Sequence, residues 1–164
     1  MLAGFADSER KNDRVVERPE GSDAMAHEQE RQPIEVVIEA LGTEAYCYAY
    51  DAAAQAIRLA GVAAAESGWP GDLGVLPDSL APDAQPVQVL VLGRQPTFPG
   101  CLVEVRPIGV LSMRDEKGVD QKILAVPVGD PRFAGVADLD DVPPHFLREV
   151  EHFFTVYKTL EEKA

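Results

Sequence analysis

The chain has 164 residues, 46% of them hydrophobic and 26% charged, which is ordinary for one globular domain with a sizeable core. Its 28 acidic and 15 basic residues give a net charge of −13, which would repel phosphate backbones and anionic lipid heads. We therefore expect neither nucleic acid nor a membrane surface as a partner. The acidity suits a protein that gathers divalent cations, and acidic solubility alone explains it equally well.

The first 32 residues differ in composition from the rest of the chain. They are polar and mixed in charge, with little aliphatic content and no sustained periodicity, so we predict a disordered extension over residues 1–32 and a domain over 33–164. They also lack the apolar stretch of a signal peptide, and no apolar run in the chain approaches the roughly 20 residues that cross a bilayer. Cys47 and Cys101 are too few for a disulfide framework. These observations predict a cytoplasmic protein.

From Pro33 onward, β-branched and aromatic runs predict a series of short strands, each bounded by Pro, Gly or Asp. The predicted strands are 34–39, 46–50, 57–59, 87–92, 102–113 and 122–128. Residues 68–78, punctuated by Gly and Pro, are predicted to be a loop. Many strands followed by a single long helix predict an α+β fold with a closed or sandwich-like sheet.

The C-terminal segment carries the one clear helical pattern. Pro143 and Pro144 mark its start, and apolar residues then recur at spacings of 4, 3, 4 and 3, which predicts one apolar face. These residues are Phe146, Val150, Phe153, Tyr157 and Leu160. His145 and His152 are seven residues apart and therefore share a face, where an interface or core role is expected rather than a metal site.

Several motifs occur together and in order. Residues 105–111 read Val-Arg-Pro-Ile-Gly-Val-Leu, residues 113–127 carry Asp-Glu-Lys-Gly-Val-Asp-Gln-Lys, and residues 151–158 end in Tyr-Lys. From about Ile34 to its end the chain resembles the family I, soluble and magnesium-dependent, inorganic pyrophosphatases. The resemblance implies a small five-stranded OB-like β-barrel with flanking helices and an amphipathic C-terminal helix. It also implies a homo-oligomer, either a trimer or a hexamer.

In that family, carboxylates hold Mg²⁺ ions that activate a water for attack on diphosphate, and Lys, Arg and Tyr side chains neutralise the phosphates. The resemblance places metal ligands at Asp115, Asp120, Asp83 and Glu39. It places phosphate-binding groups at Lys122, Tyr157 and Lys158. Without the family context, Asp115, Asp120 and Asp83 would be solvated turn or loop residues, and Lys122, Tyr157 and Lys158 would be surface or capping groups.

Six further family positions carry residues that cannot perform the family's chemistry. Where the family reads Asp-Gly-Asp-Pro-x-Asp, this chain has Gln85 at the proton acceptor and Gln88 at the ligand that bridges two metal ions. An amide keeps an oxygen but has no charge and cannot act as a base. The other four positions are Cys47 for lysine, Ala49 for glutamate, Gly61 for arginine and Leu73 for tyrosine. No basic neighbour would activate Cys47 as a nucleophile.

Losing a general base costs about 10²–10⁴ in rate, and losing a preorganised charge partner costs roughly 10²–10³. We therefore expect a pseudoenzyme with a binding or assembly role, no assignable catalytic residue and at most weak Mg²⁺ binding. Two alternatives stay open. One is a slow magnesium-dependent diphosphatase, and the other is a regulatory subunit that joins an active paralogue.

Overall fold

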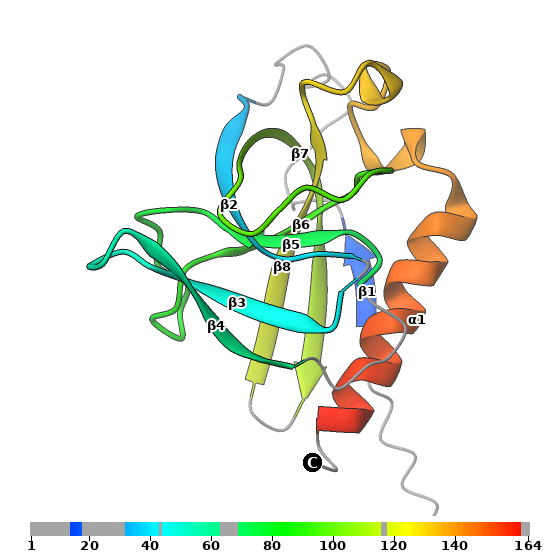
Figure 1. Cartoon of the computed structure of the whole chain (residues 1–164). Coiled ribbons are helices and arrows are strands. Elements are labelled where there is room, and N and C mark those ends of the chain that lie inside the picture. Colours follow the sequence, from blue (N-terminus) through cyan, green and yellow to red (C-terminus); the bar gives the residue numbers. More distant parts are fainter. Residues whose placement is uncertain (1–13, 18–31, 43, 63–68, 116–117, 162–164) are drawn as a thin grey trace, which may run out of the picture.

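The computed structural model describes residues 14–17, 32–42, 44–62, 69–115 and 118–161 (Figure 1). These residues form eight strands, one α-helix and two short 3₁₀ turns. The strands are β1 (Arg14–Glu17), β2 (Ile34–Ala40), β3 (Tyr46–Asp51), β4 (Ala56–Val62), β5 (Asp72–Val75), β6 (Gln88–Val91), β7 (Leu102–Asp115) and β8 (Gly118–Pro127). The helix is α1 (Pro144–Glu161), and the 3₁₀ turns are Pro131–Phe133 and Leu139–Asp141.

Five strands close on themselves. β7 pairs with both β8 and β2, while β8 pairs with β6, β6 with β5 and β5 with β2. Only the β6–β8 pair is parallel. Closure leaves these five strands without an open edge. The ring and the C-terminal helix confirm the α+β class and the OB-like architecture.

The other three strands extend the sheet beyond the ring. β1 pairs with β7, and the β3–β4 hairpin continues from β2. Figure 1 shows α1 along one flank of the sheet and the tip of the β3–β4 hairpin projecting on the opposite side. Of β4's two edges, only the one facing β3 is paired in the described residues.

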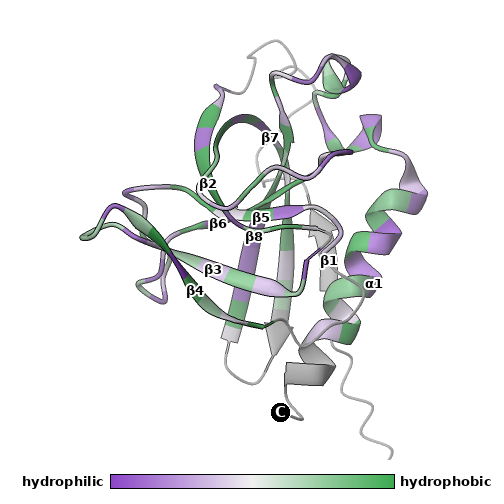
Figure 2. Ribbon diagram, viewed as in Figure 1, coloured by the Kyte–Doolittle hydropathy of each residue, from purple (hydrophilic) through white to green (hydrophobic). Residues whose placement is uncertain are grey.

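The core lies inside the ring and under α1. Val36, Ile38, Val89 and Val105 are fully buried within the ring, as expected for β-branched residues on the inward side of strands. On the face of α1 that packs on the sheet, Val150 and Phe154 are buried. Figure 2 shows hydrophobic and hydrophilic residues alternating along the helix.

The predicted apolar stripe of α1 is confirmed where its side chains are described: Phe146, Phe153 and Tyr157 are partly buried against the same core as Val150, while the side chain of Leu160 lies outside the described residues. Phe154 is only 1% exposed and was absent from the predicted stripe. Within the described residues no helix is both long and apolar enough to cross a membrane.

A close backbone approach explains Gly74 in β5. A Cβ added there would lie 2.5 Å from the carbonyl oxygen of Val37, which is shorter than any tolerated contact. Glycine therefore allows β5 and β2 to pair here.

Two strands lie where none was predicted. β5 falls within the expected loop 68–78, because its four residues include an aspartate and a glycine that are uncommon in strands. β1 falls within the expected extension 1–32, so residues 14–17 are not unstructured. The remainder of residues 1–31 lies outside the described part of the chain.

Candidate functional site

The strand register brings three of the substituted positions together. Ala40 in β2 lies opposite both Cys47 in β3 and Leu73 in β5, and Cys47 lies opposite Gly61 in β4. Cys47 and Leu73 pack, partly buried, against the core cluster that contains Trp69. The cationic and phenolic groups expected here are thus replaced by small or apolar groups on adjacent strands.

At Gly61, no described side chain occupies the space that the family's arginine would take. Among the described residues, no atom lies within 4 Å of a Cβ added at Gly61. Ala49, two residues beyond Cys47 on β3, is exposed. Within β3, β4 and the turn that joins them, only Asp51 and Arg58 are charged, and they form an ion pair at 2.7 Å.

Lys122 is the centre of the other side of the site. It lies directly opposite Gln88 in the parallel β6–β8 pair, and its side chain is buried. The Nζ group donates to Oε1 of Gln88 and to both carboxylate oxygens of Asp120, at 3.3 and 3.2 Å. It also lies 5.8 Å from the ring centroid of Phe154. The protein's own groups therefore compensate the buried ammonium.

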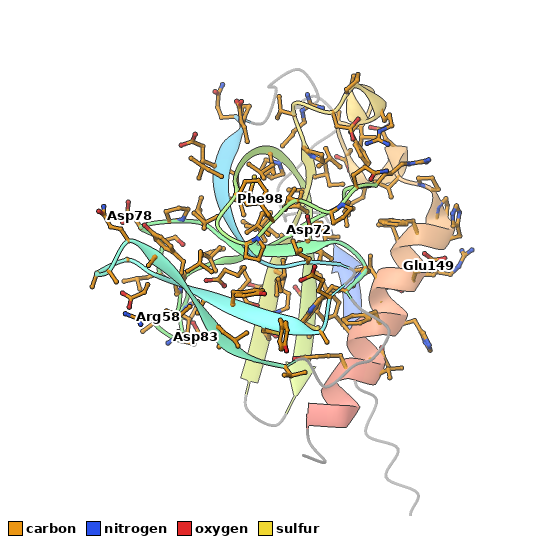
Figure 3. The ribbon with its side chains drawn as sticks, viewed as in Figure 1. Arg58, Asp72, Asp78, Asp83, Phe98 and Glu149 are labelled. Carbon is orange, nitrogen blue, oxygen red and sulfur yellow. The ribbon has the colours of Figure 1, made fainter. Side chains whose placement is uncertain are left out.

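Asp83 and Gln85 lie on an exposed loop between β5 and β6. Oδ1 of Asp83 accepts a hydrogen bond from the backbone N–H of Gln85 at 3.0 Å, which is a local Asx turn. Figure 3 shows Asp83 on the β3–β4 side of the sheet, away from α1. Asp83 thus has a structural role in this loop.

Glu39 is near the end of β2, where its Oε1 accepts the backbone N–H of Tyr50 at 2.7 Å. Burial raises the pKa of the Glu39 carboxyl, and the hydrogen bond from Tyr50 offsets only part of that effect. A carboxyl that resists ionisation is a poor ligand for Mg²⁺.

The raised pKa makes a prediction about stability. Protonated Glu39 contributes stability below the ordinary glutamate pKa of about 4.3, and this contribution is lost as the pH rises through the higher folded-state pKa. The variant Glu39→Gln keeps the acceptor for Tyr50 without the charge. It should therefore be more stable than the wild type at pH 7, with the advantage shrinking toward pH 4, as measured by urea unfolding. Glu35→Gln on the same strand controls for the loss of one charge. An advantage that did not change with pH would contradict this assignment.

Asp115 and Asp120 flank the β7–β8 turn, because Asp115 lies opposite Gly118 and Met113 opposite Asp120. The side chain of Asp115 lies outside the described residues, as does that of Lys158 at the end of α1. Tyr157 is described, with its ring centroid 4.8 Å from that of Trp69 and 5.8 Å from that of Phe153. His145 and His152 are both exposed.

The predicted ligands whose side chains the structure describes, Asp83, Asp120 and Glu39, do not form a cluster for several metal ions. Among the described side chains, no three from His, Cys, Asp and Glu converge on a common point. Asp120 is directed to Lys122, Asp83 to its own loop and Glu39 to Tyr50.

Two features of the site were absent from the sequence-based expectations. The pairing of Gln88 with Lys122 depends on strand register, which spacing along the chain does not reveal. Trp69 packs beneath Tyr157, and its buried Nε1 has no hydrogen-bond partner in the described part of the chain. The sequence around Trp69 did not predict its contact with Tyr157.

Taken together, the closed sheet, the β7–β8 hairpin and α1 define an OB-like α+β domain. A sequence model of the family described as "Inorganic pyrophosphatase" matches residues 36–164. The inorganic pyrophosphatase of Methanosarcina acetivorans is 43% identical over 134 residues, covering 82% of this chain and 80% of that protein. That of Nostoc sp. is 44% identical over 131 residues, covering 80% and 78%.

The structural comparison agrees. The crystal structure of the inorganic pyrophosphatase from Thermus thermophilus superposes with a TM-score of 0.75 and 40% identity, covering 83% of this chain and 78% of that one. This chain belongs to the inorganic pyrophosphatase family. The names of its relatives favour the diphosphatase alternative over a protein without enzyme activity.

Proposed function

We propose that this chain is a strongly attenuated inorganic diphosphatase, which releases phosphate at a rate at least about 10³-fold below that of intact relatives. Family membership and the relatives' names support diphosphate as the substrate. We infer the low rate from the contacts of the Lys122 side chain. Its buried ammonium is held by Gln88 and Asp120, so a phosphate would have to compete with the protein's own groups.

The chemistry of the substituted residues leads to the same conclusion. Gln85 cannot accept a proton from an attacking water, and Gln88 brings no charge to a metal ion. Phosphates would meet Cys47, Gly61 and Leu73 in place of a lysine, an arginine and a tyrosine. Lys122, Tyr157 and Lys158 remain as the phosphate-binding half of the site.

A second candidate is a binding or assembly role without turnover, including that of a regulatory subunit beside an active paralogue. It is favoured by the contrast between the altered site and the scaffold, where the closed ring and the covering helix are intact. Under either candidate we expect a homo-oligomer, a trimer or hexamer, located in the cytoplasm.

Magnesium binding tests how much of the metal site remains. Ala49, Gln85 and Gln88 remove three negative charges, and Mg²⁺ dehydrates reluctantly without several carboxylates. Isothermal titration should therefore show at most one ion per chain, with a Kd no better than about 1 mM, on the Asp115–Asp120 side. Asp115→Asn combined with Asp120→Asn should abolish it.

Glu149→Gln, an exposed acidic position on α1 labelled in Figure 3, is the control for the loss of negative charge and should leave the titration unchanged. Two or more tight sites, or binding that is indifferent to both aspartates, would contradict the proposal.

A further inference from the structure

A cavity of about 430 Å³ lies away from the site described above. It is formed by the segment after β6 and the segment after β8, and Asp72 of β5 forms part of its wall. Asp72 is labelled in Figure 3. Its lining includes Val91, Val103, Pro131, Arg94 and Arg132. None of the residues assigned to the diphosphate site lines it. Its volume falls in the range of about 300–1,000 Å³ that is typical of small-molecule sites.

Asp72 uses both of its carboxylate oxygens in hydrogen bonds within the protein. It is only 6% exposed. Its carboxylate accepts the backbone N–H of Gly42 at 2.9 Å, the backbone N–H of Thr97 at 2.9 Å and the Thr97 hydroxyl at 2.8 Å. These bonds also fix the segment that carries Arg94, which makes the wall of the cavity preformed.

The second acidic group of the lining is neutralised by an arginine. Nε of Arg132 donates to Asp130 at 2.9 and 3.1 Å, and Nη2 donates at 2.6 Å. This contact, with a smaller contribution from Arg94, lowers the pKa of the Asp130 carboxyl. The charges of Asp130 and Arg132 therefore neutralise each other within the cavity lining.

Arg94 is the second arginine of the lining, and its guanidinium is not held in an ion pair by a described residue. It is exposed. A guanidinium presents a rigid fork of donors that matches carboxylate and phosphate oxygens. The lining carries two aspartates and two arginines, so its formal charge is balanced in a chain with a net charge of −13, and Val91 and Val103 give it apolar surface.

We propose that this cavity binds a small organic anion, a carboxylate or a phosphate monoester. Its oxygens pair with Arg94, and its apolar body packs on Val91, Val103 and Pro131. This site is independent of the diphosphate site and of its residual activity.

Isothermal titration of the full chain with phenyl phosphate and with benzoate tests the proposal. At least one should bind with a Kd of about 1 mM or tighter, while inorganic phosphate and benzyl alcohol, each lacking one half of the recognition, should bind at least about tenfold more weakly. The comparison of the two anions identifies which oxyanion the cavity prefers.

Variants locate the binding. Arg94→Ala should weaken it by about tenfold or more, because a charge-assisted contact is lost. Arg58→Ala, which removes an exposed arginine from the β3–β4 hairpin, should leave it unchanged. Gly129→Leu should also weaken binding, since a Cβ at this lining position meets nothing within 4 Å and a larger side chain can be accommodated.

The proposal is overturned if neither anion binds at about 10 mM, or if binding is indifferent to Arg94→Ala. It is also overturned if Arg94→Ala changes the oligomeric state by light scattering, because the cavity would then be covered by a second copy of the chain. Phosphate release from diphosphate is a separate assay, so failure here leaves the proposed function standing and the reverse also holds.

Discussion

Restoring the six substituted groups together should raise phosphate release from diphosphate by at least about 100-fold. The variant combines Cys47→Lys, Ala49→Glu, Gly61→Arg, Leu73→Tyr, Gln85→Asp and Gln88→Asp. The scaffold has room for the larger groups where the structure can be checked, since Gly61 faces open space and Ala49 and Gln85 are exposed. Catalytic groups that act as a unit are strongly non-additive, so single restorations should have little effect.

The matched control restores Cys47→Lys, Ala49→Glu, Gly61→Arg and Leu73→Tyr but keeps Gln85 and Gln88. It should stay near the wild-type rate, because the proton acceptor and the bridging ligand are still missing. If the variant with all six substitutions folds and keeps the oligomeric state of the wild type but shows no gain in phosphate release, the six substituted positions do not explain the low rate.

The second large effect is on stability. Phe154→Ala should lower the free energy of unfolding by about 3–5 kcal/mol, because it empties a fully buried position between α1 and the sheet. The ring centroid of Phe154 lies 6.0 Å from that of Trp69 and 5.2 Å from that of Phe153. It also lies 5.8 Å from Nζ of Lys122, so the variant should loosen the retained half of the site.

Urea unfolding followed by circular dichroism measures this loss. Val156→Ala, two residues further along α1 and 43% exposed, is the control and should cost less than about 1 kcal/mol. Equal losses for the two variants would mean that α1 is not anchored through Phe154.

Local patterns in the sequence were sufficient for much of the fold. The run of β-branched residues in β2 and the Pro-Pro start of α1 predicted both elements close to their observed bounds. β5 escaped because its four residues read as turn chemistry, and only pairing with β2 and β6 makes it a strand. Phe154 was not predicted as a core residue, because the helical spacing equally allowed its neighbour Phe153 to be the more deeply buried one.

The site shows a similar division. Motifs placed Lys122 and Asp120 in the site, and the structure does bring these two side chains into contact. They gave no indication that Gln88 would become a partner of Lys122, because that contact follows from the parallel register of β6 and β8. The cavity beside Arg94 likewise arises from two loops far apart in the chain.

The most direct test of the account is phosphate release from diphosphate with Mg²⁺, measured beside the inorganic pyrophosphatase of Thermus thermophilus under the same conditions. We predict a rate at least about 10³-fold lower for this chain, given the loss of the general base and of the charged groups around it. Turnover within about tenfold of that relative, and abolished by Asp120→Asn, would contradict the account.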